Sequence, residues 1–494
     1  MKKYILEITV FICGAIVMIF ELVGSRVLGP YLGTSIFVWT SLIGVILGSL
    51  SIGYILGGKI ADKKSNLRIL SLIIFFAGIY INLTMFTKES IIIFLQNSFI
   101  DIRLSSVFAS IILFAPTSIL LGMVSPYAIK LKLNNLSTSG STVGNLYAIS
   151  TIGSIIGTFS SGFYLIPAFG TTKILLILSL SLIILSIILS SKQLIKTKFT
   201  FIFLISISWL TVGRVNYLLA QNGFIDVDTK YNHVQIIDYQ DAETGKPARG
   251  LRVNNESSSA MFIDDGELVF EYTKYYNLIE HFNPSFKKSL VIGGAAFSYP
   301  KYYLKAYPEA SMDVVEIDPK LTEFAKTYFY LQENPRLNIY HEDGRTFLNK
   351  TSNKYDAILG DAFKSHYSIP YQLTTREAIQ KKYDILNDGG VVILNIISSI
   401  GGISGQFLRA EYATYKQIFP QVYLFPVNNQ LAVNNVQNII LVALKSSEIP
   451  KFKNENEELN KYLEHLWTGK IEEDMPIITD DHAPVDYYIS KIIK

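Results

Sequence analysis

Long apolar runs fill the first 220 residues of the chain and are scarce after them. An α-helix needs about 20 predominantly apolar residues to cross the hydrocarbon core of a bilayer. Six runs are close to that length, so we expect residues 1–220 to form a membrane domain. The expected spans cover residues 4–23, 36–56, 67–86, 104–129, 143–166 and 174–189. A seventh run, residues 199–219, is interrupted by Gly213 and Arg214, and whether it spans is left open.

Glycines recur in these runs at the spacing of helix contacts. Small residues let the backbones of membrane helices approach closely. We therefore expect helix packing at the following positions: Gly44, Gly48, Gly53, Gly57, Gly153 and Gly157.

From about residue 221 the pattern changes to short alternating segments. Residues 231–239, 250–254 and 261–264 alternate apolar and polar positions, as half-buried strands do. Turn-forming residues lie at 245–247 and 264–266. The sequence therefore predicts a small antiparallel β domain over residues 221–275.

Residues 276–494 alternate short apolar strands with helical stretches. This alternation is typical of a parallel, doubly wound α/β sheet. The expected strands cover residues 289–292, 312–317, 337–340, 355–360 and 391–396, with two last strands near 422–425 and 438–444. In such sheets, ligands bind outside the carboxyl ends of the strands.

Glycines and carboxylates lie at the ends of the first four of these strands or directly after them. The residues are Gly293, Gly294, Glu316, Asp343, Gly344 and Asp361. Glycine lets a ligand approach the backbone closely. A carboxylate at the position of Glu316 can accept both hydroxyls of a ribose. Asp343 could accept from an adenine amino group, and Asp361 lies where a general base would be useful. Each feature alone is commonplace, but together they indicate a nucleoside site at one sheet edge.

Composition narrows the class of protein. Of 494 residues, 49% are hydrophobic and only 17% are charged, which is too apolar for an ordinary soluble enzyme. The net charge of +3 is too small to indicate a nucleic-acid partner. Cys13 is the one cysteine and the six histidines are scattered, so we expect neither an intrachain disulfide nor a metal site.

These motifs together resemble the spermidine synthase-like aminopropyltransferases. The carrying residues are Gly293-Gly294, Glu316 to Asp318, Asp343-Gly344 and Asp361, preceded by a β domain. The whole chain looks like the integral-membrane branch of that family. The resemblance implies a Rossmann-like sheet of the S-adenosylmethionine methyltransferase type. It also implies S-adenosylmethionine or its decarboxylated form as co-substrate, an amine acceptor, and a possible homodimer.

The resemblance also assigns roles to single residues. It implies that Glu316 binds the ribose hydroxyls and Asp343 the adenine amino group. Asp361 matches the residue that helps deprotonate the attacking amine. Tyr272 matches a tyrosine that lines the amine site.

Two departures concern the amine side. The glycine loop of the family usually ends in an aspartate that holds an ammonium group, and here that position is Ala296. A second aspartate is missing from the loop after the fourth strand, where Asp361 is followed by Ala-Phe-Lys-Ser-His. The alternatives are therefore an S-adenosylmethionine-dependent methyltransferase, or a non-catalytic nucleoside sensor or transport regulator.

The charges of the loops predict which parts of the chain lie on the cytoplasmic side of the membrane. Lysines follow the second, fourth and sixth apolar runs, which places those loops and the N-terminus in the cytoplasm. The implied co-substrates are cytosolic, so we expect the C-terminal domain on the cytoplasmic side. This requires that residues 199–219 do not cross the membrane fully.

A last polar cluster, residues 479–484 (Thr-Asp-Asp-His-Ala-Pro), is either a surface turn or a functional feature.

Overall fold

The computed structural model describes the whole chain except residues 1–3, 100, 134–138, 191–205, 207–208, 211–212, 215–217, 219–222, 362–368, 429–432 and 493–494. The chain divides into two compact units. One comprises Met1–Asn222 and Asp226–Lys230, and the other comprises Gly223–Ile225 and Tyr231–Lys494.

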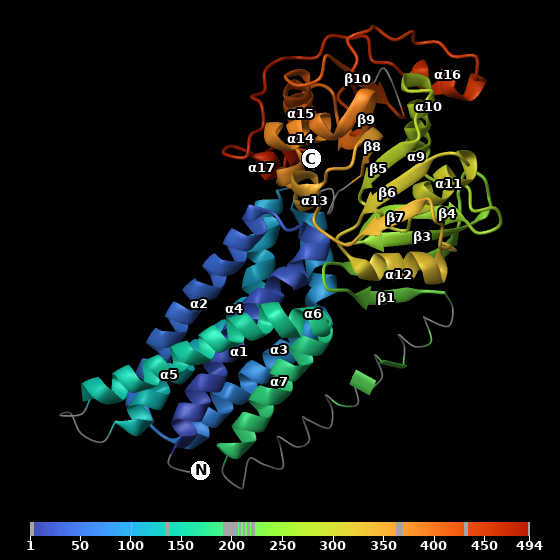
Figure 1. Ribbon diagram of the computed structural model, residues 1–494. Helices are drawn as coiled ribbons and strands as arrows, with labels where there is room; N and C mark the ends of the chain where they lie inside the picture. Colours follow the sequence, from blue (N-terminus) through green and yellow to red (C-terminus); the bar gives the residue numbers. More distant parts are fainter. Residues whose placement is uncertain are drawn as a thin grey trace. The chain divides into compact units, whose positions relative to one another are not determined.

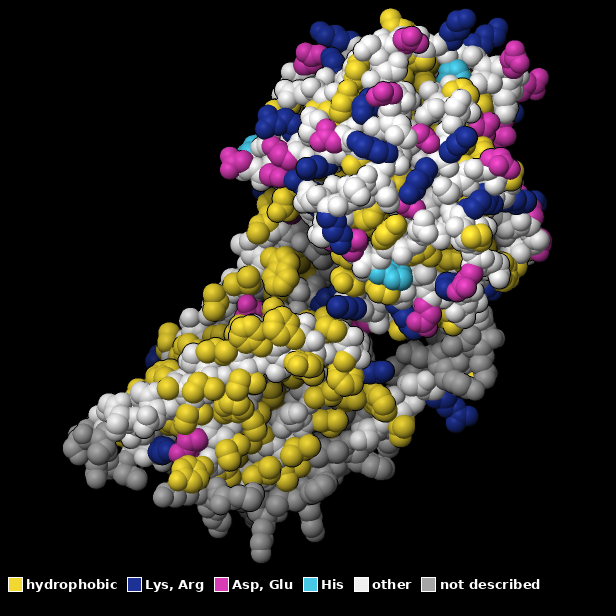
Figure 2. Space-filling view, in the orientation of Figure 1, with side chains coloured by type: hydrophobic (Ala, Val, Ile, Leu, Met, Phe, Trp, Pro, Cys, Tyr) yellow, Lys and Arg dark blue, Asp and Glu magenta, His cyan; other side chains and the backbone are white. Residues whose placement is uncertain are grey.

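The first unit is helical (Figure 1). Six helices in the described residues are long and apolar enough to cross a membrane, as expected. They are α1 (Ile5–Leu32), α2 (Ile36–Lys63), α3 (Leu67–Ser98), α4 (Ile102–Lys132), a fifth made of α5 (Ser139–Ser160), η3 (Ser161–Leu165) and α6 (Ile166–Ala168), and α7 (Thr171–Ile188). Figure 2 shows hydrophobic side chains spread over the outer face of this unit, which suits contact with lipid. Most of the seventh run, residues 199–219, lies outside the described residues.

Glycines pack two pairs of these helices against each other. A β-carbon at Gly153 of α5 would overlap the carbonyl oxygen of Phe11 in α1, and one at Gly53 of α2 would overlap the carbonyl of Ile119 in α4. Gly57 and Gly157 are equally crowded by backbone. The packing prediction is therefore confirmed for Gly53, Gly57, Gly153 and Gly157. It is wrong for Gly44 and Gly48, where a β-carbon would meet no atom of the described chain within 4 Å.

The small sheet has four strands in the order β1-β2-β3-β4. Its strands are β1 (Ile225–Asp228), β2 (His233–Gln240), β3 (Pro247–Val253) and β4 (Glu256–Phe262). β3 pairs antiparallel with both β2 and β4, as predicted. The last strand begins earlier than expected because Asn254 and Asn255 both take positive φ, at 52° and 68°. Such a residue pair closes a tight two-residue hairpin, and β4 starts directly after it.

The large sheet has seven strands in the order β10-β11-β9-β8-β5-β6-β7. They are β5 (Lys288–Ile292), β6 (Ser311–Val315), β7 (Leu337–Tyr340), β8 (Tyr355–Gly360), β9 (Leu386–Ser398), β10 (Gln421–Pro426) and β11 (Gln437–Leu444). The first five are parallel, as predicted. β11 runs antiparallel to β9 and β10, so the sheet is mixed and Rossmann-like. Residues 427–436 connect β10 to β11. This connection is shorter than the dozen or more residues that a parallel crossover needs, which agrees with the antiparallel pairing of the two strands.

Helices cover both faces of this sheet (Figure 1). One buried core joins the strands to α13 (Gly344–Lys350), α14 (Arg376–Ile385), α15 (Gln406–Lys416) and α17 (Val485–Ile489). The other joins them to η4 (Tyr275–Leu278), α10 (Ile279–Phe282), α11 (Ser298–Ala306), α12 (Pro319–Tyr328) and α16 (Glu457–Leu463). The strand order reverses between β5 and β8, which is the switch point where ligands bind in such sheets.

Candidate active site

The register of the parallel strands aligns the residues that follow them. Ile292 at the end of β5 pairs with Val315 of β6 and with Gly360 of β8. The next residues in these strands are Gly293, Glu316 and Asp361, which therefore share one edge of the sheet. Backbone bonds continue across that edge, from the Gly293 N–H to the Val315 carbonyl (2.9 Å) and from the Asp361 N–H to the Ile292 carbonyl (3.1 Å).

The glycine loop is tightly folded against the sheet. Gly293 takes a φ of 100°, which a residue with a β-carbon rarely adopts. A β-carbon at Gly294 would lie 2.9 Å from the ring of Phe297 and 3.1 Å from Val314. Ala295 also has positive φ, at 45°, a conformation that costs an alanine about 1 kcal/mol or more. Both glycines are therefore needed for the loop itself, besides any ligand that approaches it.

The carboxylate of Glu316 is buried and holds this loop. Its Oε2 accepts from the N–H groups of Gly294 (2.9 Å) and Ala295 (3.1 Å), and its Oε1 accepts from the N–H of Asp318 (2.9 Å). Burial raises the pKa of Glu316, and these three backbone bonds oppose the rise. An ionised carboxylate offers about four acceptor positions. Three are used, so one remains for a ligand hydroxyl.

Asp318 and Asp343 both cap helices. Asp318 accepts from the N–H of Lys320 at the start of α12 and also from the side-chain amide of Asn232. Oδ1 of Asp343 accepts from the N–H and the hydroxyl of Thr346 at the start of α13. Within the described chain no hydrogen bond ends on Oδ2 of Asp343. This oxygen can therefore accept from a ligand while the other caps the helix.

Asp361 receives two side-chain hydrogen bonds. Tyr272, on α9 (Glu271–Lys274), donates its hydroxyl to Oδ2 at 2.8 Å. The side-chain amide of Asn395 in β9 donates to Oδ1 at 3.3 Å. Burial raises the pKa of Asp361 to about 6, although both hydrogen bonds lower it. A carboxyl group with such a pKa is mostly ionised at neutral pH and takes up a proton more readily than an exposed one, which suits a general base.

Tyr272 belongs to an aromatic wall beside Asp361. Its ring stacks on Phe270 with centroids 5.9 Å apart and meets Tyr276 edge-on. The Tyr276 hydroxyl donates to the carbonyl of Gly360, and its ring contacts Tyr299. Burial first, and then the charge of Asp361, raise the pKa of Tyr272 well above its usual value. Tyr272 is therefore a hydrogen-bond donor at this site and not a base.

Sequence reasoning missed Asn395 and Tyr276. The signal for Asn395 was present, because it is a polar residue inside the apolar segment 391–396. It lies next to Asp361 because Gly360 and Leu394 are paired in β8 and β9. Its Oδ1 is buried and has no hydrogen-bond donor within the described residues. Tyr276 carried no local signal, since it lies in a chain segment rich in aromatic residues.

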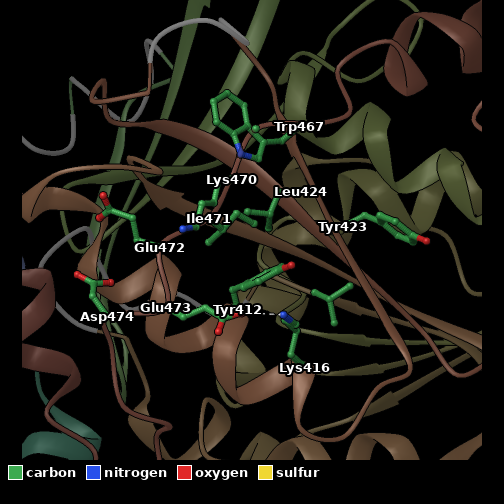
Figure 3. Close-up of a pocket in the computed structure, with 12 residues that line it drawn as sticks. Tyr412, Lys416, Tyr423, Leu424, Trp467, Lys470, Ile471, Glu472, Glu473 and Asp474 are labelled. Atoms are coloured by element: carbon green, nitrogen blue, oxygen red, sulfur yellow. Dashed lines mark hydrogen bonds and ion pairs between the residues drawn. The ribbon is translucent and has the colours of Figure 1, made fainter.

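A separate groove of about 890 Å³ lies beside α15 and β10 (Figure 3). Its walls include Tyr412, Tyr423 and Trp467, and none of the expected site residues line it. Lys416 and Asp474 in its walls are ion-paired, with Glu473 and Arg409 respectively. We therefore do not assign the groove to the nucleoside.

No group of three or more His, Cys, Asp and Glu side chains that could hold a metal ion is found in the described parts of the chain.

Comparisons with known proteins match the part of the chain that contains this edge to one family. Residues 265–447 match the family described as spermine/spermidine synthase domain. A polyamine aminopropyltransferase from Vibrio vulnificus is 33% identical over 166 residues, which are 33% of this chain and 54% of that protein. A polyamine aminopropyltransferase from Saccharolobus islandicus is 28% identical over 44% of this chain and 70% of its own length.

Among solved structures, a probable spermidine synthase from Corynebacterium glutamicum is similar, with a TM-score of 0.41 and 21% identity. That match covers 50% of this chain and 88% of the other. The match to the Vibrio protein spans only about half of that relative. Residues 265–447 form a spermine/spermidine synthase domain in the C-terminal half of a chain whose N-terminal half holds six long apolar helices.

Proposed function

We propose that the C-terminal domain transfers an aminopropyl-type group from decarboxylated S-adenosylmethionine to an amine, with Asp361 as general base. The spermidine synthase family uses that co-substrate. The observation that carries the proposal is the placement of Asp361. It follows β8 at the switch point, beside the glycine loop, and accepts from Tyr272 and Asn395.

In the proposed step, the lone pair of a neutral amine attacks the carbon bonded to the sulfonium. The C–N bond forms while the C–S bond breaks, and the electron pair of that bond goes to sulfur, which becomes a neutral thioether. The proton lost by the attacking nitrogen goes to Asp361. The leaving group is already activated by its charge, so positioning and proton removal are what the protein has to supply.

The acceptor in this proposal is not a simple diamine such as putrescine. Ala296 is buried at the position where the family usually has a carboxylate, and a methyl group cannot hold an ammonium ion. The sequence after Asp361 also lacks the second aspartate. This loss of acceptor-side charge favours methyl transfer from S-adenosylmethionine as a second candidate. A nucleoside sensor without catalysis is a third.

Product analysis separates these functions. The purified full-length chain is titrated by calorimetry with S-adenosylmethionine and with its decarboxylated form, and then incubated with a panel of amines. Methylthioadenosine is the expected product, and S-adenosylhomocysteine would instead support methyl transfer. Asp361→Asn is the matched control, because it should keep nucleoside affinity and lose turnover. Binding without either product would support the sensor and contradict the proposal.

A further inference from the structure

The polar cluster near the end of the chain forms a closed turn. Thr479 and His482 exchange backbone hydrogen bonds, each 3.1 Å long. A backbone bond from Arg376 to the carbonyl of Ile478 ties the turn to the start of α14. The turn presents Asp480 to residues that lie far away in the sequence, so it is more than a surface feature.

Asp480 makes four polar contacts. Arg345 binds it through both ends of the guanidinium group, from Nη1 to Oδ1 at 3.2 Å and from Nη2 to Oδ2 at 2.7 Å. Thr375 donates its hydroxyl to Oδ1 at 2.6 Å. The N–H of Asp480 donates to Glu377 at 2.9 Å. The two-point arginine–carboxylate contact fixes orientation as well as distance.

Arg345 connects this turn to the start of α13 and to the segment that precedes α14. It lies in the first turn of α13, the helix capped by Asp343. Its Nη1 also donates to the carbonyl of Gln372 and to the hydroxyl of Thr375, each at 3.0 Å. Gln372 belongs to η5 (Tyr371–Leu373), in the connection that leads from Asp361 to α14. The Arg345 side chain is only 16% exposed, so water competes little for these bonds.

The start of α13 has little freedom to move without disturbing the sheet edge. A β-carbon at Gly344 would lie 2.9 Å from Ile292, the last residue of β5, and 3.4 Å from Leu373. Ile292 directly precedes the glycine loop. A shift of Arg345 would therefore move Asp343 relative to that loop and to Glu316.

We infer that Asp480 is a positioning residue, which acts through Arg345 to hold Asp343 at the nucleoside side of the site. The inference rests on the proposed function for the identity of the ligand. The contacts themselves explain why an acidic turn some 135 residues away in sequence from Arg345 is held at this point of the fold. They also predict that nucleoside binding depends on a residue that does not touch the nucleoside.

The chain supplies a matched control one position away. Asp481 is exposed and has the same charge, but the structure gives its side chain no hydrogen bond or ion pair with any described residue. Asp481→Ala therefore removes the same charge as Asp480→Ala without removing any of the side-chain contacts described above. Asp480→Asn keeps an acceptor for Thr375 and loses the ionic pair, which covers the case in which the alanine variant fails to fold. Asp480→Glu tests rescue by a carboxylate.

Two measurements on the full-length protein test the inference. Amide hydrogen exchange, without ligand, should speed up at residues 344–347 and 371–376 in Asp480→Ala and Asp480→Asn, but not in Asp481→Ala. In turnover, the KM for the sulfonium nucleoside should rise roughly tenfold, because small misplacements of binding groups are costly. The kcat and the KM for the amine should change little, and Asp480→Glu should recover part of the loss.

The outcomes are distinguishable. Equal exchange in the Asp480 and Asp481 variants would overturn the connection between the turn and α13. Faster exchange with an unchanged KM for the nucleoside would overturn the positioning role. A failure of the unmodified chain to bind either sulfonium nucleoside would instead overturn the proposed function, while the exchange comparison would still decide whether the turn holds α13.

Discussion

The hydroxyl of Tyr272 donates to Oδ2 of Asp361 at 2.8 Å, and this bond joins the small helix α9 to the end of strand β8. A hydrogen bond to the charged form of a carboxyl group lowers its pKa, so Tyr272 opposes the rise that burial causes. Tyr272 therefore extends to lower pH the range in which Asp361 is ionised and can accept a proton.

The pH profile of the reaction should reveal this pair. Asp361 must be ionised to act as base, so kcat/KM for the nucleoside should fall about tenfold per pH unit below about 6 and level off above it. Tyr272→Phe removes the bond that lowers the pKa, so this limb should move to higher pH. Tyr276→Phe is the control, because its hydroxyl binds the Gly360 carbonyl and not the carboxylate. An unmoved limb in Tyr272→Phe would contradict the assignment of Asp361 as the titrating group.

Asp343→Asn should weaken nucleoside binding without unfolding the helix it caps. Asparagine caps helices about as well as aspartate, so α13 keeps its N-terminal bond. The charge that would accept from the adenine amino group is lost, and a hydrogen bond to a charged group contributes about 1.5–3 kcal/mol. Calorimetry should show affinity lower by about tenfold or more, with the melting temperature nearly unchanged. Full affinity in this variant would remove Asp343 from the site.

Glu316→Gln should reduce both affinity and stability. An amide nitrogen cannot accept, so either Oε1 or Oε2 loses its backbone partners from Gly294, Ala295 or Asp318. We expect binding to weaken by about tenfold or more, on the same scale of 1.5–3 kcal/mol per bond to a charged group. Thermal melting with and without nucleoside separates the two effects. Glu309→Gln, at an exposed position, is the control. Unchanged affinity would show that the carboxylate serves only the loop.

Putrescine should be a poor acceptor for the natural chain, below the rate of about 1 s⁻¹ that is usual for enzymes. Ala296→Asp restores a carboxylate at the position that holds a cation in the family, and should raise putrescine turnover. Because Ala296 is buried, the new charge should also lower the melting temperature until an amine binds. Ala295→Asp, one position earlier, should not gain activity. Turnover of putrescine by the unchanged chain at about 1 s⁻¹ would refute this prediction.

Single cysteines test the sidedness of the C-terminal domain. Ser65 and Ser447 are exposed, and so is Asn97 near the end of α3. Each is changed to cysteine in a Cys13→Ser background, and intact cells are treated with an impermeant maleimide. The loop charges place Ser65 in the cytoplasm, so Asn97, at the other end of α3, is expected outside the cell. Asn97→Cys should therefore react in intact cells. If the C-terminal domain is cytoplasmic, Ser65→Cys and Ser447→Cys should react only after lysis. Reaction of Ser447→Cys in intact cells, with Ser65→Cys protected, would place the domain outside.

The lengths of the apolar runs predicted the six long helices, and the short alternating segments predicted the two sheets and the shared sheet edge. Strand ends of a parallel sheet meet by geometry, so Gly293, Glu316 and Asp361 were predictable as neighbours from the order of the strands. The direction of β11 was less accessible, because its apolar pattern is the same in either orientation. To predict this direction, the length of the connection between β10 and β11 must be compared with the length that a parallel crossover needs.

Contacts between distant segments were beyond local reasoning. Asp480 and Arg345 meet only because the tail returns to α13, and neither residue signals the other in sequence. The same holds for Asn395 and Asp361. Glu316 was expected only as a ligand for ribose, whereas its oxygens already bind the backbone of the glycine loop. These are consequences of tertiary packing, which apolar patterns and motif spacing do not encode.

The bonds between Glu316 and the glycine loop also have a kinetic meaning. A loop that must become ordered around its ligand loses conformational entropy at the moment of binding, and that loss weakens affinity and slows association. Here the N–H groups of Gly294 and Ala295 are fixed by the buried carboxylate of Glu316, which belongs to the chain itself. We therefore expect the proposed nucleoside side to be preorganised, so that capture of the sulfonium nucleoside resembles the docking of a rigid body and approaches the rate set by diffusion and orientation.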